Sequence, residues 1–149
     1  MKTFVVDASV GAKWASPEIV EPLADRADRF LRAYVDGIIQ VVVPDLFWLE
    51  IGSFLWKAAK RGTITPVLAR RALAAMLNRD FPTLPSRAFL PEAFKIATDF
   101  DRTIYDSTYV AMATATGKEL ITADERLVNA LGSRFPVRWL GAFQADTRD

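Results

Sequence analysis

The sequence predicts an α/β fold of three layers, in which helices cover both faces of a central parallel sheet. Short runs of β-branched and aromatic residues, typical of fully buried strands, alternate with segments whose apolar residues recur at helical spacing. This alternation favours right-handed crossover connections and therefore a parallel sheet. The 149 residues are expected to form a single domain, 1–149, with a frayed polar tail at 145–149.

Proline, glycine and small polar residues delimit the elements of the first half. Ser9 is expected to cap the first helix, and Pro17 suits the first turn of the second. Pro44 stops the second strand, and Gly62 is expected as a C-terminal cap. The expected elements are a strand at 3–6, helices at 9–14 and 17–37, a strand at 38–43, and helices at 45–61 and 66–79.

The second half follows the same alternation. Pro91 favours a helix start, Thr103 and Asp124 are expected N-caps, and Gly117 ends a helix. The expected elements are a loop or short edge strand at 81–85, helices at 91–100 and 103–116, a strand at 119–122, a helix at 124–131 and a strand at 137–140.

The composition excludes several kinds of chemistry. The chain has no cysteine and no histidine, which excludes disulfides, thiolate nucleophiles, Ser-His-Asp triads and His-ligated metals. The net charge is +1, so a cluster of acids in one site would leave the remaining surface net basic. The chain enters its first strand without a signal-peptide pattern, and no apolar run approaches the ~20 residues of a membrane span. We therefore expect a soluble, cytoplasmic protein.

Four acidic residues mark the ends of strands or the first turns of the helices that follow them. Asp7 and Asp124 directly follow strands, Glu50 lies in the second turn of its helix, and Asp106 lies in the first turn. In open α/β sheets ligands bind at the carboxyl ends of the strands. Converging carboxylates repel one another unless a cation lies between them, and hard divalent ions prefer oxygen ligands. The four acids together therefore predict a metal site that acts on phosphates.

Each acid alone also has a structural interpretation. Asp124 suits a simple N-cap, and Thr103 with Asp106 resembles a capping box. Asp7 suits a turn, and Glu50 suits a solvent-exposed helix face. Their joint placement at one edge of the sheet favours the shared site over four separate structural roles.

These segments resemble the PIN-domain ribonucleases, most closely the VapC-type toxins of toxin–antitoxin pairs. The resemblance covers nearly the whole chain, and four segments in this order are far more specific than any one of them. The segments are Val5-Val6-Asp7-Ala8-Ser9-Val10 with Lys13-Trp14, then Val43-Pro44-Asp45-Leu46 leading to Glu50, then Tyr105-Asp106-Ser107-Thr108-Tyr109-Val110-Ala111, and finally Leu120-Ile121-Thr122-Ala123-Asp124-Glu125-Arg126-Leu127.

The resemblance implies a PIN-like fold and an endoribonuclease that leaves 5′-phosphate and 3′-hydroxyl ends. The four acids would be its catalytic residues and would hold Mg²⁺ or Mn²⁺. Ser9 and Thr122 would support the site through hydrogen bonds. The family often has asparagine three residues after the helix acid. This chain has Ser53 there, which can still form a hydrogen bond and would be a third supporting residue.

Basic residues near the acids are candidates for RNA binding. Lys13, Arg102 and Arg126 are nearest to the acids in sequence. Further basic residues at 57–61 and 70–79 have two interpretations, a solvated helix surface or a phosphate-binding rim around the acids.

The helix at 45–61 is more apolar than one buried face requires. Phe47, Trp48 and Trp56 are therefore candidates for a partner surface. In the resembled family this region meets a VapB-type antitoxin protein, and homodimers are usual. Two alternatives to a toxin remain: a PIN-domain nuclease of RNA processing or decay, and a catalytically silent RNA- or protein-binding module. The intact set of four acids disfavours the silent module.

Overall fold

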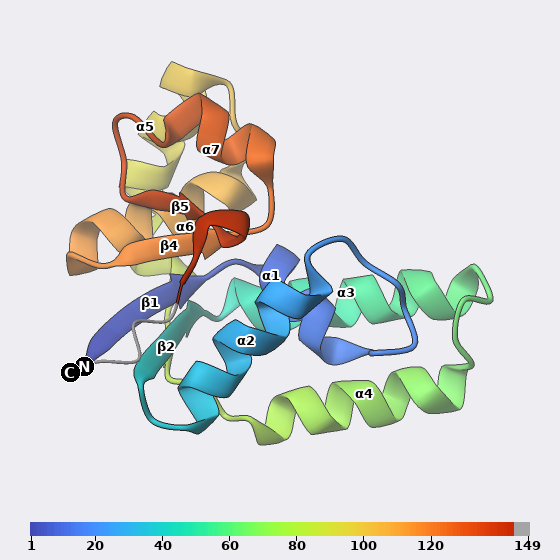
Figure 1. The fold of residues 1–149 in the computed structure, drawn as a ribbon. Coiled ribbons are helices and arrows are strands. Elements are labelled where there is room, and N and C mark those ends of the chain that lie inside the picture. Colours follow the sequence, from blue (N-terminus) through green and yellow to red (C-terminus); the bar gives the residue numbers. More distant parts are fainter. Residues whose placement is uncertain (145–149) are drawn as a thin grey trace.

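The computed structural model describes residues 1–144, and Figure 1 shows its fold. In chain order the elements are β1 (Lys2–Val6), α1 (Ala8–Ala15), α2 (Ala24–Val35), β2 (Ile39–Pro44), α3 (Leu46–Lys60), α4 (Pro66–Asn78), β3 (Thr83–Leu84), the 3₁₀ helix η1 (Ser86–Phe89), α5 (Leu90–Phe100), α6 (Ile104–Thr116), β4 (Glu119–Thr122), α7 (Glu125–Leu131), β5 (Val137–Trp139) and the 3₁₀ helix η2 (Leu140–Ala142).

All five strands lie in one parallel sheet, which confirms the predicted fold class. The strand order is β3-β2-β1-β4-β5. Strand β1 pairs with β2 on one side and with β4 on the other. Strands β2 and β3 therefore lie to one side of β1 and strands β4 and β5 to the other, so the strand order reverses between β1 and β4. Val6 is paired with Ile121 in this register, which places Asp7 beside Thr122 at the carboxyl edge of the sheet. That edge is where ligands bind in folds of this kind.

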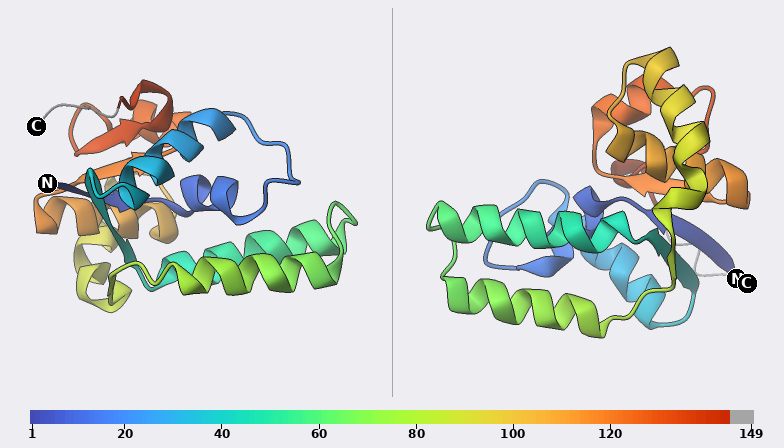
Figure 2. Two further views of the ribbon diagram at one scale, coloured as in Figure 1. Left: turned by 60° about the horizontal axis from the view of Figure 1, so that its bottom comes forward. Right: turned by 180° about the vertical axis from the view of Figure 1, so that it is seen from behind.

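Helices flank the sheet, and two of them extend beyond it. Helix α6 packs against β1, β2 and β4, and α2 packs against β2. The antiparallel pair α3–α4 projects past the sheet, on the side where β1 leads into α1 (Figures 1 and 2). The carboxyl edge is therefore bordered by α1, α3, α6 and the turn that follows β4.

A glycine brings two acid-bearing segments together. A Cβ atom on Gly11 would lie 2.6 Å from the ring of Phe47 and 3.0 Å from Cδ1 of Ile51. Real side chains do not tolerate the shorter distance. Glycine at this position therefore allows α1, which follows Asp7, to pack closely against α3, which carries Glu50.

The start of the second helix differs from the sequence prediction. Helix α2 begins at Ala24 rather than at Pro17, and Leu23 before it has a left-handed backbone with φ of 63°. Pro22 lies inside the predicted helix, where it lacks an N–H donor and clashes with the preceding turn. The segment 17–23 therefore forms a turn and loop.

One further expectation changes, one is confirmed, and one lies outside the described part. Helix α1 begins at Ala8, so Asp7 rather than Ser9 occupies the N-cap position, although its side chain makes no capping hydrogen bond. The segment at 81–85, expected as a loop or short edge strand, contains the short edge strand β3. The predicted tail at 145–149 lies outside the described residues.

Candidate active site

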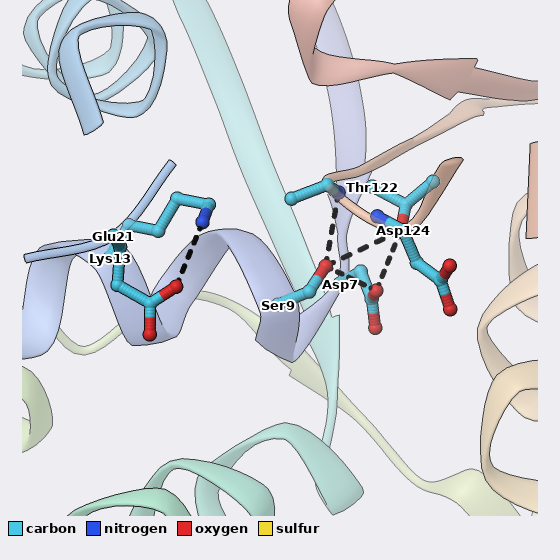
Figure 3. A network of polar contacts seen from close by, with 7 residues as sticks. Asp7, Ser9, Lys13, Glu21, Thr122 and Asp124 are labelled. Carbon is cyan, nitrogen blue, oxygen red and sulfur yellow. Dashed lines mark hydrogen bonds and ion pairs between the residues drawn. The ribbon is translucent and has the colours of Figure 1, made fainter. Parts of the chain in front are cut away.

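Asp7 is the most buried of the four acids. It follows β1 directly, is 5% exposed, and its backbone N–H donates to the carbonyl of Ile121 at 3.0 Å. Its Oδ2 accepts hydrogen bonds from Ser9 Oγ at 2.6 Å and from Thr122 Oγ1 at 2.8 Å (Figure 3). The hydrogen bonds expected of Ser9 and Thr122 are therefore present, and both are made to the same carboxylate oxygen.

The turn after β4 fixes the direction of these hydrogen bonds. The backbone N–H of Ala123 donates to Ser9 Oγ at 3.0 Å, and that of Asp124 donates to Thr122 Oγ1 at 3.0 Å. A backbone N–H can only donate, so each hydroxyl uses a lone pair for it and keeps its own proton for Asp7. The β1 and β4 ends are thereby joined through one carboxylate.

Asp124 combines a structural role with a place in the site. Its Oδ1 accepts from the backbone N–H groups of Arg126 and Leu127 at 3.0 and 3.4 Å, which caps α7 as the sequence predicts. This cap holds the carboxylate at the edge of the sheet, close to Asp7 (Figure 3).

The structure brings all four acids to one pocket of about 250 Å³. Besides the acids, the pocket is lined by Ala8, Ser9, Ala12 and Phe54. Glu50 reaches it from α3, and Asp106 reaches it from the first turn of α6, whose N-cap Thr103 accepts from the Asp106 N–H at 3.0 Å. Larger cavities exist elsewhere on the described part, but the 570 Å³ cavity at the amino end of the sheet contains no acidic residue.

Burial and mutual repulsion raise the pKa values of three of these acids. Burial raises the pKa of Asp7 to about 6, against the hydrogen bonds from Ser9 and Thr122, with smaller contributions from Asp106 and Asp124. Burial, followed by repulsion from Asp7, raises the pKa of Glu50 to about 7. Burial and the charge of Asp124 raise the pKa of Asp106. The carboxylates therefore interact electrostatically across the pocket, as a shared site requires.

Tyr109 is a member of the site that the sequence prediction did not single out. Its side chain is fully buried on α6, and its hydroxyl faces Glu50 and the backbone N–H of Ala8. The Tyr109–Glu50 contact influences the pKa of both groups but falls short of a standard hydrogen bond. As a result, the hydroxyl of Tyr109 and Oε1 of Glu50 are both buried without a partner.

The residues of the pocket fit a hard divalent cation. Every charged donor is a carboxylate oxygen, the ligand type that Mg²⁺ and Mn²⁺ prefer. Glu50 also has a buried, unpartnered oxygen, which is costly unless a ligand satisfies it. Within residues 1–144 no three acids lie close enough to form a preassembled metal cage. This spacing is consistent with the mutual repulsion of the carboxylates.

The predicted substrate-binding residues differ in burial and in their distance from the pocket. Lys13 is only 6% exposed and pairs with Glu21 at 3.2 Å, so it does not line the pocket (Figure 3). Arg102 is partly buried, near enough to Asp106 to oppose the rise of its pKa. Arg126 is exposed at the start of α7, beside the capping carboxylate of Asp124. Ser53 is exposed on α3 and does not line the pocket.

The three aromatic residues predicted to bind a partner differ in how far they are buried. Phe47 is fully buried in the core, so its assignment to a surface was wrong. Trp48 is partly buried, stacks on Phe81 and donates from Nε1 to Thr83 Oγ1 at 3.0 Å. Trp56 is 59% exposed, with Lys60 Nζ 5.0 Å from its ring centre. Only Trp56 therefore presents most of its surface to solvent.

Comparison with protein families and known proteins gives a consistent result. The family model described as PIN domain matches residues 4–131. Two similar proteins come from Pyrobaculum aerophilum. Ribonuclease VapC3 is 32% identical over 126 residues, which cover 83% of this chain and 90% of that protein. Exonuclease VapC9 is 33% identical over 114 residues, which cover 73% of this chain and 84% of that protein.

Solved structures share the fold at lower identity. A crystal structure of a Pyrobaculum aerophilum protein has a TM-score of 0.68 and 22% identity, covering 94% of this chain and 90% of that one. A toxin–antitoxin complex from Klebsiella pneumoniae has a TM-score of 0.61 and 15% identity, covering 91% of this chain and 95% of that one. In the described part of the chain, no helix has the length and apolar character needed to cross a bilayer.

Proposed function

This chain belongs to the PIN-domain family, and from that premise we propose that it is a divalent-metal-dependent endoribonuclease, the toxin of a type II toxin–antitoxin pair. The observation that carries the proposal is the pocket lined by Asp7, Glu50, Asp106 and Asp124, with three of the four pKa values raised. Four such acids without a bound cation cost stability, and that cost has no structural benefit in a silent binding module.

The four acids would hold Mg²⁺ or Mn²⁺ at the carboxyl edge of the sheet. When bound, the ion supplies Lewis-acid stabilisation of the scissile phosphate and acidifies water. The chain's own residues orient the ligands: Ser9 and Thr122 fix Asp7, and the α7 cap fixes Asp124. With no histidine in the chain, a pocket carboxylate is the side chain available to accept the proton of the attacking water.

The partners follow from the same family assignment. We propose an RNA substrate, a VapB-type antitoxin protein and a homodimer, since both relatives carry VapC names. The apolar surface around Trp56 supports a protein partner on α3. Light scattering of the purified protein tests the dimer: a monomeric mass at micromolar concentration contradicts it.

An exonuclease is the second candidate, because one of the two relatives is named as such. A circular RNA separates the two activities, since only an endonuclease can open a molecule without ends. We expect Mg²⁺ or Mn²⁺ to support cleavage of both circular and linear RNA, and EDTA to abolish both. The Asp7→Asn variant, purified in parallel, controls for contaminating nuclease.

The outcomes are distinct. Degradation of linear RNA alone supports the exonuclease. Cleavage by the parent that persists in EDTA, and that the Asp7→Asn preparation lacks, contradicts the metal-dependent mechanism. Equal cleavage by both preparations instead reveals a contaminating nuclease. A protein that binds metal but cuts neither RNA is either the silent module or a nuclease with a narrower RNA target. Sequencing of cellular RNA 5′ ends after brief induction distinguishes these two.

A further inference from the structure

Tyr109 joins three of the acid-bearing segments at one point. It lies three residues after Asp106 on α6, so the two side chains share a helix face. Its ring is fully buried, and its hydroxyl lies where Glu50 of α3 and the first residue of α1, Ala8, meet. Asp7 immediately precedes that first residue. A rigid side chain in the core thus ends among three of the four carboxylates.

The surroundings of the hydroxyl set the direction of its proton. The N–H of Ala8 is in the first turn of α1, where backbone donors have no partner within the helix. That N–H lies near the phenol oxygen without closing a standard hydrogen bond, and a backbone N–H can approach that oxygen only as a donor. The O–H of Tyr109 is then left to point at Glu50, which needs a donor because its buried Oε1 has none.

We propose that Tyr109 is a positioning residue, whose hydroxyl donates to the Glu50 carboxylate and orients it for metal binding in the acid pocket. This inference rests on the proposed function of the same site. The two groups lie near each other without closing a standard hydrogen bond, since neither Tyr109 Oη nor Glu50 Oε1 has a partner. Glu50 would be one of the residues that hold the cation, and a hydrogen bond from Tyr109 would limit the orientations that its carboxylate can adopt.

A positioning role and a structural role predict opposite effects on the metal-free protein. A buried hydroxyl that stabilises the fold lowers the melting temperature when it is removed. Removing a buried hydroxyl that has no partner does not lower the melting temperature, because it removes the cost of burying an unsatisfied polar group. Tyr109→Phe retains the buried ring, so the comparison isolates the oxygen atom.

The experiment compares Tyr109→Phe with the parent in three measurements. Thermal unfolding without metal should give an equal or higher melting temperature. Calorimetry with Mn²⁺ alone should show affinity weakened about 10- to 100-fold, the usual loss for a group that orients a metal ligand. RNA cleavage should show a comparable fall in kcat with KM unchanged. Tyr105→Phe is the matched control, because that tyrosine is 60% exposed on the same helix, and it should behave as the parent.

A double-mutant cycle with Glu50→Gln identifies the residue through which Tyr109 acts. If it acts through Glu50, Tyr109→Phe weakens Mn²⁺ binding in the parent but has little further effect in the Glu50→Gln background. Unchanged Mn²⁺ affinity in Tyr109→Phe, or a melting temperature that falls in proportion to the lost activity, overturns the proposal. So does an effect that is fully additive with Glu50→Gln. If the parent binds Mn²⁺ but cuts no RNA, the proposed function fails, while the metal titrations still test this inference.

Discussion

Thr122 donates from Oγ1 to Oδ2 of Asp7 at 2.8 Å, and this hydrogen bond links the carboxyl ends of β1 and β4. The same hydroxyl accepts the N–H of Asp124, so one fully buried atom orients two of the four acids. The position of the site thus depends on the pairing of β1 with β4 as well as on the acids themselves.

Thr122→Val should lower both stability and activity, whereas Thr122→Ser should largely preserve them. Valine removes the hydroxyl without changing the volume much, leaving the Asp124 N–H and Asp7 each short of a partner. Lost hydrogen bonds to charged groups cost about 1.5–3 kcal/mol, and lost orientation of a ligand costs about 10-fold or more in rate. Chemical denaturation and RNA cleavage measure the two effects. Equal values for the valine and serine variants would show that the hydroxyl orients nothing.

Asp7→Asn should abolish cleavage and stabilise the metal-free protein above about pH 6. The folded pKa of Asp7 is raised from 3.8 to about 6, so ionisation is disfavoured in the fold. The parent is therefore destabilised as pH rises from about 4 to 6, by about 3 kcal/mol at most. The amide retains an oxygen that can accept from Ser9 and Thr122. Denaturation from pH 4 to pH 8 checks this, with the exposed Asp28→Asn as control: a variant no more stable than the parent at pH 8 contradicts it.

Metal binding should release protons near neutral pH. Glu50 has a pKa of about 7 and Asp7 one of about 6, so both are partly protonated in the metal-free protein at pH 6.5. A cation requires the ionised forms, so Mn²⁺ affinity should fall as pH is lowered from 8 to 6. Calorimetry in buffers of different ionisation enthalpy counts the released protons, and Glu50→Gln should release fewer. Binding at pH 6.5 that is independent of the buffer would rule out this linkage.

The strands and the four acids were predictable because their signals are local. A β-branched run followed by an acid is visible around Asp7 and around Asp124, and the sheet then brings such ends together. Lys13 could not be placed in this way, because its pairing with Glu21 depends on the path of the 17–23 loop, which Pro22 determines. Tyr109 has the appearance of an ordinary core residue in the sequence. Only the fold, which brings α6, α3 and α1 to one pocket, shows that its hydroxyl lies near Glu50.

Lys57 and Arg61 should contribute to RNA affinity. They lie seven and eleven residues after Glu50, and Phe54 of the pocket lies four after it, so all share one face of α3. This face extends about 16 Å from the site, and within residues 1–144 neither basic side chain forms an ion pair. We expect Lys57→Glu with Arg61→Glu, in the inactive Asp7→Asn background, to weaken RNA binding and reduce its salt dependence. Fluorescence anisotropy at two salt concentrations measures this, with Arg29→Glu combined with Arg32→Glu on α2 as the charge-matched control. Equal salt slopes in the double variant and the control would exclude this face.

Trp56→Glu should weaken antitoxin binding more than RNA cleavage. Leu49 lies seven residues before Trp56 on α3, and the two side chains are 76% and 59% exposed, which is unusual for large apolar groups on one helix face. An apolar anchor of the antitoxin on this face, followed by a basic residue, could reach the acid pocket. Trp48 is unsuitable for this test, because its ring stacks on Phe81 and its loss would disturb the fold.

The measurements are calorimetric affinity for a VapB-type antitoxin and the cleavage rate on a model RNA, after circular dichroism has confirmed folding. Val35→Glu is the control. Val35 is 62% exposed on α2, so this substitution also replaces an apolar surface residue with a charged one. We expect a loss of about tenfold or more in antitoxin affinity for Trp56→Glu alone, the size associated with a buried aromatic anchor. A folded Trp56→Glu variant that binds antitoxin as tightly as Val35→Glu does would exclude this face of α3 from the interface. The antitoxin would then have to reach the acid pocket across another side of its rim.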